Sequence, residues 1–161
     1  EIKAINSSLL QKDIPCLIVS VKKNRKGHIK ELHEKLCGLS ETSSLKMILY
    51  VEHTVDAHDL PIALWRFCNN LDPKRDYILS KNENIKGSDK YNACIGFDGT
   101  IKTREFDNFE RDWPNIIVSD AETIRSIDSK WSGLEIGSFI SSPSLKFRDQ
   151  LYGDEAAVQS S

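Results

Sequence analysis

Residues 46–76 read KMILYVEHTVDAHDLPIALWRFCNNLDPKRD, and this stretch decides the fold that the sequence predicts. Residues 45–51 are mostly apolar, a pattern typical of a strand that is covered on both faces. A helix follows, because Asp59 can cap its first turn and Pro61 lacks the N–H that such a turn leaves unbonded. The apolar side chains that mark its buried side are Ala63, Leu64, Phe67 and Cys68. The stretch therefore predicts a strand, a polar loop and an amphipathic helix in succession.

The same alternation appears upstream. Residues 14–21 form another apolar, β-branched run, and residues 22–28 form a basic loop before a helix that ends at Gly38. This helix has apolar side chains at i, i+3 and i+4 spacing, with one histidine among them: Ile29, Leu32, His33, Leu36 and Cys37.

Downstream, we expect short strands at residues 76–79 and 93–97. A third helix should begin at the capping box of residues 119–122, and its apolar face should comprise Ile124, Ile127 and Trp131. This order predicts an α/β (or α+β) fold, a layered domain whose mixed, partly parallel sheet is flanked by helices. We assign residues 1–137 to that domain and residues 138–161, which show little periodicity, to a C-terminal arm.

Composition and charge narrow the class of protein. The 161 residues carry 22 Lys and Arg against 24 Asp and Glu, a formal net charge of −2, which argues against a protein that coats nucleic acid. No apolar run approaches the ~20 residues of a membrane span. The four cysteines, Cys16, Cys37, Cys68 and Cys94, form no CxxC pair and are expected to be reduced core residues of a cytosolic protein.

The densest group of polar side chains lies in the loop after the second strand and comprises Glu52, His53, Asp56, His58 and Asp59. Ligands bind in α/β sheets at loops of this kind, beyond the carboxyl ends of strands. Carboxylates and imidazoles together can hold a divalent metal ion or transfer protons. The spacing matches no established ligand pattern, so we expect an acidic turn whose aspartates cap the helix, with a metal site as the alternative.

Other features also have a functional and a structural interpretation. The basic loop at residues 22–28 precedes a helix N-terminus, a physically reasonable anion site, but it lacks the glycine spacing of a P-loop and is expected to be solvated. Asp98-Gly99 predicts a turn, and no Gly-x-Ser-x-Gly elbow offers a hydrolase nucleophile. Core or interface positions are expected for Trp65, Trp113 and Trp131. The residues alone thus predict a soluble α/β domain and name no reaction.

The order of the motifs resembles that of a known family. Its elements are Gly27-His28, the strand, loop and helix of residues 46–76 with Trp65, the turn Asp72-Pro-x-Arg75-Asp76, the segment Ile95-Gly-Phe-Asp98-Gly-Thr100, and Trp113-Pro114. In this succession the chain is similar to the C-terminal region of the UbiD-like carboxy-lyases. These comprise 3-octaprenyl-4-hydroxybenzoate carboxy-lyase and related decarboxylases of quinone biosynthesis. The resemblance covers about residues 14–134.

The resemblance implies a much longer parent chain, whose upstream split-barrel and flavin-binding domains are the partners of this segment. Prenylated FMN and a divalent metal, Mn or Mg, would act there on an aromatic acid of the polyprenyl-hydroxybenzoate kind. The segment alone is expected to be inactive, with no catalytic, cofactor-binding or metal-binding residue of its own. The family-motif positions, taken as mainly structural, are Asp56, Asp59, Trp65, Asp72, Pro73, Arg75, Asp76, Gly96, Asp98 and Thr100.

The resemblance also implies a role as lid and assembly element of a cytoplasmic homo-oligomer. Residues 138–161 would contact another subunit, and a prenylated substrate would bring the parent to a membrane surface; no nucleic acid is expected as a partner. Gly99 stands where relatives carry alanine, and residues 80–92 are short and polar where many relatives have a Leu-Asp-Pro-like loop. The alternatives are a non-catalytic oligomerisation module derived from the family, and a stand-alone metal- or small-molecule-binding domain that uses residues 52–59.

Overall fold

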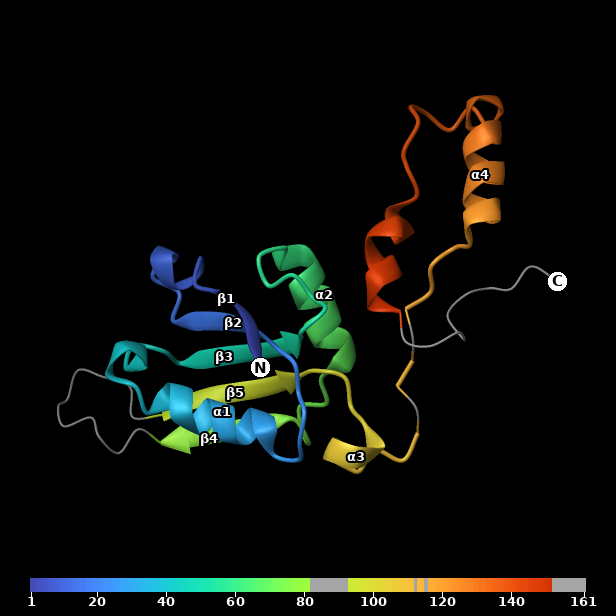
Figure 1. The fold of residues 1–161 in the computed structure, drawn as a ribbon. Helices are drawn as coiled ribbons and strands as arrows, with labels where there is room; N and C mark the ends of the chain where they lie inside the picture. The colour runs from blue at the N-terminus through green and yellow to red at the C-terminus, as the bar shows by residue number, and fades with distance from the viewer. Residues whose placement is uncertain (82–92, 112, 115, 152–161) are drawn as a thin grey trace. The chain divides into compact units, whose positions relative to one another are not determined.

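The computed structural model describes residues 1–81, 93–111, 113–114 and 116–151 (Figure 1). The chain divides into two compact units, Glu1–Trp113 and Pro114–Ser161, and each is considered by itself. The expected polar stretch at residues 80–92 lies mostly outside the described residues. The division of the chain after residue 137 stays a prediction.

The first unit is built on a five-stranded sheet with the order β1-β2-β3-β5-β4. The strands are β1 (Ile2–Asn6), β2 (Cys16–Val21), β3 (Met47–Glu52), β4 (Tyr77–Lys81) and β5 (Ala93–Gly99). β2, β3 and β5 are parallel, whereas the edge strands β1 and β4 are antiparallel to their neighbours. The predicted mixed, partly parallel sheet is therefore confirmed. β2 is buried along its whole length, as the continuous apolar run predicts.

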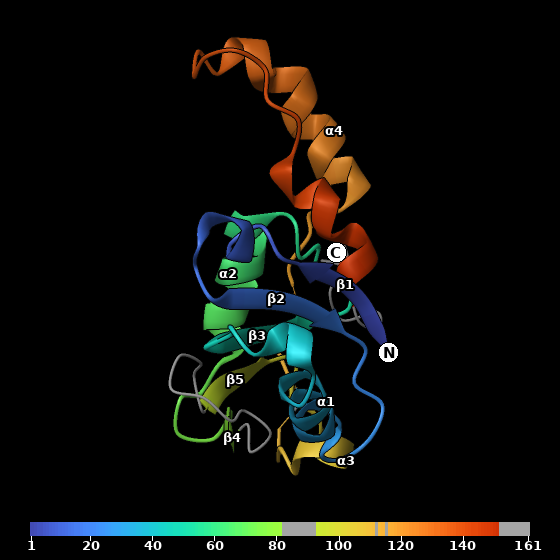
Figure 2. The ribbon, with the colours of Figure 1, turned by 90° about the vertical axis from the view of Figure 1, so that its left-hand side faces the viewer.

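Two helices cover opposite faces of this sheet (Figure 2). α1 (His28–Cys37) contributes Ile29 and Cys37 to one core cluster, and α2 (Leu60–Asn70) contributes Ala63 and Phe67 to the other. Alternate residues of the strands enter the two clusters, because successive side chains of a strand point to opposite faces. In β3, for example, Ile48 and Tyr50 pack on the α1 side. The flanking helices thus follow the predicted layers.

Some boundaries differ from the sequence prediction. β1 and the short helix α3 (Arg104–Asp107) were not expected, because each is too short to show a periodic apolar pattern. The predicted cap of α2 is confirmed, since the Asp59 carboxylate accepts from the N–H of Ile62 at 3.3 Å. The capping box that begins at residue 119 is wrong by one position. Asp120 caps α4 (Ala121–Lys130) because its carboxylate accepts from the first-turn amides.

The second unit has no buried residue in its helices, which are α4 and the 3-10 segments Trp131–Gly133 and Pro143–Gln150. The indole N–H of Trp131 donates to the carbonyl of Gly137 over 3.2 Å, and its ring meets Phe139 edge to face at 5.8 Å. Two further 3-10 turns, Leu10–Lys12 and Ser40–Thr42, belong to the first unit. Within the described ranges, no helix has the length and apolar character needed to cross a membrane.

Candidate functional site

The sheet brings several polar loops to one edge. Val21 lies opposite Glu52 and Val51 opposite Gly99 in the parallel register, so the segments after β2, β3 and β5 all leave from this edge. β4 is antiparallel to β5. It begins at this same edge, because its first residue, Tyr77, lies opposite Phe97 near the carboxyl end of β5. We call this the carboxyl edge. It is where ligands and functional groups gather in sheets of this kind.

A buried ammonium group lies at the carboxyl edge. Lys102 is 2% exposed, and its Nζ donates to the carbonyl oxygens of Asp98 at 2.6 Å and Thr100 at 3.0 Å. The same Nζ lies 3.2 Å from Oδ1 of Asp98 and 3.7 Å from Oδ2 of Asp76. Asp76 is also bound by Arg75, whose Nε and Nη2 each donate to the carboxylate over 2.7 Å.

A second lysine extends these ion pairs from the loop after β2. The Nζ of Lys23 donates to the two carboxylate oxygens of Asp107 at 2.8 and 2.7 Å and to the carbonyl of Ile101 at 2.9 Å. It also lies 3.9 Å from Oδ2 of Asp98. Three cations thus face three carboxylates, and we call these side chains the charge network: Lys23, Arg75, Lys102, Asp76, Asp98 and Asp107.

The charge network shifts the pKa of Asp98 and that of Lys102. Burial raises the pKa of the Asp98 carboxyl, but the ammonium groups of Lys102 and Lys23 and hydrogen bonds from Thr100 outweigh burial and hold this pKa below its usual range. Burial lowers the pKa of Lys102, and the carboxylates of Asp98 and Asp76 oppose that shift. Because each charge has a partner, the network binds the loops together and offers no uncommitted acid or base.

More than half of the family-motif positions lie in or beside the charge network. The Asp72 carboxylate accepts from the N–H of Lys74 at 3.0 Å, and the N–H of Asp72 donates to Asp76 over 2.8 Å. Thr100 donates its N–H and its hydroxyl to Oδ1 of Asp98, at 3.0 and 2.5 Å. The fold therefore brings the turn before β4 against the turn after β5, and it gathers the motif positions Asp72, Pro73, Arg75, Asp76, Asp98 and Thr100. A mainly structural role for them stays a prediction.

The aspartates of the acidic loop serve its backbone. Asp56 accepts from the N–H of His58 at 2.8 Å, which closes a local turn, and Asp59 caps α2. Both motif positions therefore have local acceptor roles, and the expected acidic turn matches these bonds.

Glu52 points back into the carboxyl edge. Its Oε2 accepts from the N–H of Ile101 at 3.3 Å, and its Oε1 accepts from the N–H of His53 at 3.1 Å and contacts the ring of the same histidine. Among the described residues, the side chains of residues 52–59 do not bring three ligand atoms within reach of one ion. The metal alternative for this loop therefore lacks geometric support.

The tryptophans occupy different environments. Trp65, a family-motif position on α2, is 45% exposed, with the guanidinium of Arg66 at 5.8 Å from its ring centroid. The indole N–H of Trp113 donates to the Asn70 side chain over 3.2 Å, and its ring lies 5.0 Å from that of Phe109. Trp65 is therefore not a core residue, which leaves the interface as its expected position.

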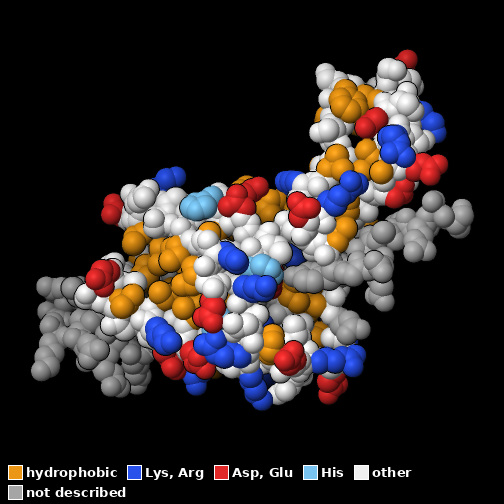
Figure 3. Space-filling view, viewed as in Figure 1, with side chains coloured by type: hydrophobic (Ala, Val, Ile, Leu, Met, Phe, Trp, Pro, Cys, Tyr) orange, Lys and Arg blue, Asp and Glu red, His pale blue; other side chains and the backbone are white. Residues whose placement is uncertain are grey.

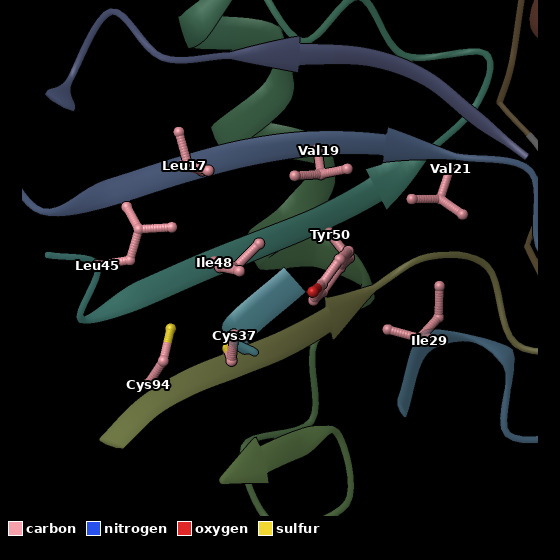
Figure 4. Close-up of a cluster of buried hydrophobic side chains, with 9 residues drawn as sticks. All are labelled: Leu17, Val19, Val21, Ile29, Cys37, Leu45, Ile48, Tyr50 and Cys94. Atoms are coloured by element: carbon pink, nitrogen blue, oxygen red, sulfur yellow. The ribbon is translucent and has the colours of Figure 1, made fainter. Parts of the chain in front are cut away.

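A separate group of side chains that are of metal-ligand type lies inside the core. His33 and Cys37 come from α1 and Cys94 from β5; all three are buried, and their ligand atoms lie within 4.8 Å of one another. The carbonyl of Cys94 can only accept, so the proton of the neutral His33 ring is on Nε2, 3.2 Å away. Nδ1 then accepts from the Tyr50 hydroxyl at 3.0 Å. Figure 4 shows Cys37, Cys94 and Tyr50 on their separate elements.

This core group does not have the geometry of a metal site. Both nitrogens of His33 are engaged, and the Cys37 Sγ lies 3.8 and 3.5 Å from Nδ1 and Nε2, over the ring rather than beyond either nitrogen. Metal coordination requires an ion in line with a nitrogen lone pair. A hydrogen bond from the Cys94 thiol lowers the pKa of Cys37, and that bond together with burial raises the pKa of Cys94. The group joins α1 to the sheet by hydrogen bonds.

A cavity of about 180 Å³ opens between the first turn of α1 and the charge network. Its walls include Lys23, Gly27, His28 and Lys30 on one side and Arg75 with the three carboxylates of the network on the other. The expectation that the basic loop is solvated is wrong for Lys23 and His28, which the fold buries. Basic and acidic side chains are interspersed over the face that carries α1 (Figure 3).

Several of these residues were missed by sequence reasoning. Lys102 could have been found, because it follows Asp98 by four residues and lies just past the segment that ends at Thr100. Lys23 and Asp107 are far apart in the sequence, and no local pattern connects them. His33 looked like part of an apolar stripe, because its spacing matches that stripe.

The chain is similar to several known proteins. Residues 1–99 match the family model of the 3-octaprenyl-4-hydroxybenzoate carboxy-lyase C-terminal domain. An uncharacterized protein of Archaeoglobus fulgidus is 31% identical over 121 residues, which are 71% of this chain and 25% of the relative. An uncharacterized protein of Aquifex aeolicus is 32% identical over 124 residues, 73% of this chain and 25% of the relative. The chain thus spans about a quarter of the length of these curated relatives.

Solved structures share the fold. The closed form of vanillic acid decarboxylase from Sedimentibacter hydroxybenzoicus superposes with a TM-score of 0.60 at 15% identity, over 85% of this chain and 29% of that one. The UbiD-class enzyme HmfF from Pelotomaculum thermopropionicum, in complex with FMN, gives 0.54 at 19% identity, over 79% and 28%. At these identities the likeness is one of fold.

Proposed function

The chain belongs to the UbiD family of carboxy-lyases, in which it corresponds to the C-terminal domain, and we propose that it is the lid and assembly element of a longer decarboxylase. The observation that carries this proposal is the family match over residues 1–99 in a chain that spans about a quarter of its relatives. The substrate that we propose is an aromatic acid of the polyprenyl-hydroxybenzoate kind, used in quinone biosynthesis.

The described residues do not fit a whole flavin. Pockets for cofactors and drug-sized ligands measure about 300–1,000 Å³, whereas the cavity beside α1 measures about 180 Å³. The carboxylates and ammonium groups of the charge network are paired with each other, so none of them is available as a metal ligand or proton donor. We therefore place prenylated FMN, its divalent metal and the catalytic groups in the upstream domains of the parent.

The proposed lid role rests on apolar surface that the first unit exposes. On α2, Leu64 and Trp65 are exposed, and on the edge strand β4, Tyr77 and Leu79 are exposed. We propose that these side chains belong to the surface that another part of the parent covers, as large exposed apolar patches do. Closing such a surface over a reaction site excludes water, which strengthens electrostatic interactions inside the site. A decarboxylase with an apolar substrate benefits from that exclusion.

The proposed assembly role rests on the second unit. None of its helices buries a residue, and its exposed apolar side chains include Ile127, Leu134, Ile136, Phe139, Ile140 and Leu145. A segment with this composition gains stability by packing on another surface. We propose that it contacts a second subunit of a cytoplasmic homo-oligomer, and that a prenylated substrate brings the parent to the membrane surface.

The test compares three proteins: the parent chain, the parent without this domain, and the isolated 161-residue chain. Carbon dioxide release is measured with a prenylated 4-hydroxybenzoate and reconstituted prenylated FMN. We expect release by the parent only, with flavin binding retained by the shortened parent. Release by the isolated chain, or by a shortened parent at full rate, would contradict the lid role. A parent that binds flavin and releases no carbon dioxide would instead favour the non-catalytic oligomerisation module.

A further inference from the structure

The cavity beside α1 contains hydrogen-bond donors that have no acceptor. Gly27, the residue before α1, has φ 73° and offers no side chain to cap the first turn. Within the described part of the chain, the backbone N–H groups of Ile29 and Lys30 have no protein acceptor, and both residues line the cavity. The first N–H groups of a helix lack intrahelical partners and carry a partial positive charge, so they favour an anion.

A buried histidine in the same wall is also incompletely bonded. His28 is 2% exposed, and its Nε2 lies 3.2 Å from a carboxylate oxygen of Glu1. Because a carboxylate only accepts, that nitrogen carries a proton. The other ring nitrogen, Nδ1, is buried without a hydrogen-bond partner. With the ring proton on Nε2, Nδ1 is an acceptor, and its natural partner is an O–H group such as the P–OH of a phosphate.

The carboxylates in the cavity wall are already engaged by cations. The carboxylates of Asp76, Asp98 and Asp107 are each bound by a cation of the charge network. Lys30 lines the cavity as well, and within the described ranges its ammonium group has no carboxylate partner. An anion at the α1 end would therefore meet unpaired donors, while the carboxylates opposite are already neutralised.

We propose that this cavity binds a phosphate group through the N–H groups of Ile29 and Lys30, the Lys30 ammonium and the His28 imidazole. A volume of about 180 Å³ accommodates a phosphate with bound water. Two sources share this chemistry, free inorganic phosphate and the terminal phosphate of a phosphomonoester, for which FMN serves below only as a probe. The site is independent of the proposed function, because it holds whether or not the parent releases carbon dioxide.

The test titrates the ¹⁵N-labelled 161-residue chain with inorganic phosphate, FMN and riboflavin, followed by two-dimensional NMR and calorimetry. We expect phosphate to shift the amide signals of Ile29 and Lys30. Lys30→Ala should weaken binding about tenfold, in line with the loss of one charge-assisted contact. Lys26→Ala is the matched control, because Lys26 is exposed in the same basic loop and does not line the cavity.

The remaining variants and ligands complete the test. His28→Asn should weaken phosphate binding too, and its spectrum shows at once whether the domain is still folded. FMN that binds with the same dependence on Lys30 identifies a phosphomonoester as a ligand, and FMN that fails to bind identifies free phosphate. No phosphate binding, binding of riboflavin as tight as that of FMN, or equal losses in Lys30→Ala and Lys26→Ala would overturn the proposal.

Discussion

The imidazole of His33 lies directly against Gly96, so that a Cβ on residue 96 would be 2.6 Å from Nδ1 of the ring. The family-motif glycine of β5 therefore has a packing reason, because the histidine of α1 occupies the space that any side chain would need. The same ring bonds to Tyr50 and to the carbonyl of Cys94. The contact thus fixes how closely α1 approaches the sheet.

Gly96→Ala is expected to destabilise the domain by roughly 1–3 kcal/mol, the usual cost of overpacking a dense core. Urea unfolding followed by circular dichroism measures this loss. Gly38→Ala is the matched control, since Gly38 has an ordinary φ of −79° at the end of α1 and a Cβ there comes no closer than 3.3 Å to its neighbours. Equal stability of the two variants would contradict the His33–Gly96 contact.

A second prediction concerns Gly99, at the end of β5. A Cβ on Gly99 would be 2.5 Å from the ring of Phe67 and 2.9 Å from the carbonyl oxygen of Tyr50. Gly99→Ala should therefore cost about 1–3 kcal/mol. Phe67→Leu removes the ring contact, so the double variant should lose less stability than the two single variants added together. A strictly additive double-mutant cycle would show that Phe67 does not determine the glycine.

The charge network predicts a strong effect of removing its buried cation. Lys102→Met leaves Asp98 and Asp76 without this partner, and the expected loss of stability is about 3–5 kcal/mol. Lys22→Met changes an exposed lysine by the same substitution and should alter stability by less than about 0.5 kcal/mol. Chemical denaturation measures the free energy of unfolding of both variants. A loss for Lys102→Met no larger than for its control would mean that the network does not hold the carboxyl edge together.

The lowered pKa of Asp98 predicts how stability depends on acid. A carboxyl whose pKa is lower in the folded chain stabilises the fold above its ordinary pKa of about 3.9, and this contribution is lost as pH falls toward the folded pKa. The free energy of unfolding should thus decrease below about pH 4. In urea titrations between about pH 2 and pH 7, the free energy of unfolding of Asp98→Asn should decrease less steeply than that of the unsubstituted chain. Identical slopes would contradict the predicted linkage.

We expect that the core group of His33, Cys37 and Cys94 does not bind zinc. Both ring nitrogens already have partners, so binding would break buried hydrogen bonds. Thermal unfolding with and without equimolar Zn²⁺ should give the same midpoint. A rise that disappears in Cys37→Ser would show instead that the side chains rearrange around a metal ion.

Local patterns were sufficient for much of the fold. The apolar runs of β2 and β3, the stripe of α1 and the Asp59 cap of α2 each depend on near neighbours, and all were predicted. β1 was not, because it alternates weakly over five residues and gains its place by pairing with β2. The cap of α4 shows the limit of motif reading, since Ser119 and Asp120 are both good caps and only backbone geometry selects the aspartate.

The candidate site was predicted less completely. Asp76, Asp98 and Thr100 were found because they belong to quoted motifs, whereas Lys23 and Asp107 meet only when the loop after β2 reaches α3. The sequence indicates an anion site at residues 22–28 only weakly, because it has no P-loop spacing. The evidence for an anion site there is the burial of His28 and the uncapped amides of α1, which only the folded chain shows.

The central claim is that these 161 residues are the C-terminal domain of a longer decarboxylase, and the mass of the native polypeptide tests it most directly. An antibody raised against the domain is used on an extract of the source cells after denaturing electrophoresis. Because the chain spans about 25% of its curated relatives, the account predicts a band several times heavier than 18.3 kDa. A single band near 18.3 kDa would contradict it, since the domain would then exist without upstream flavin-binding domains.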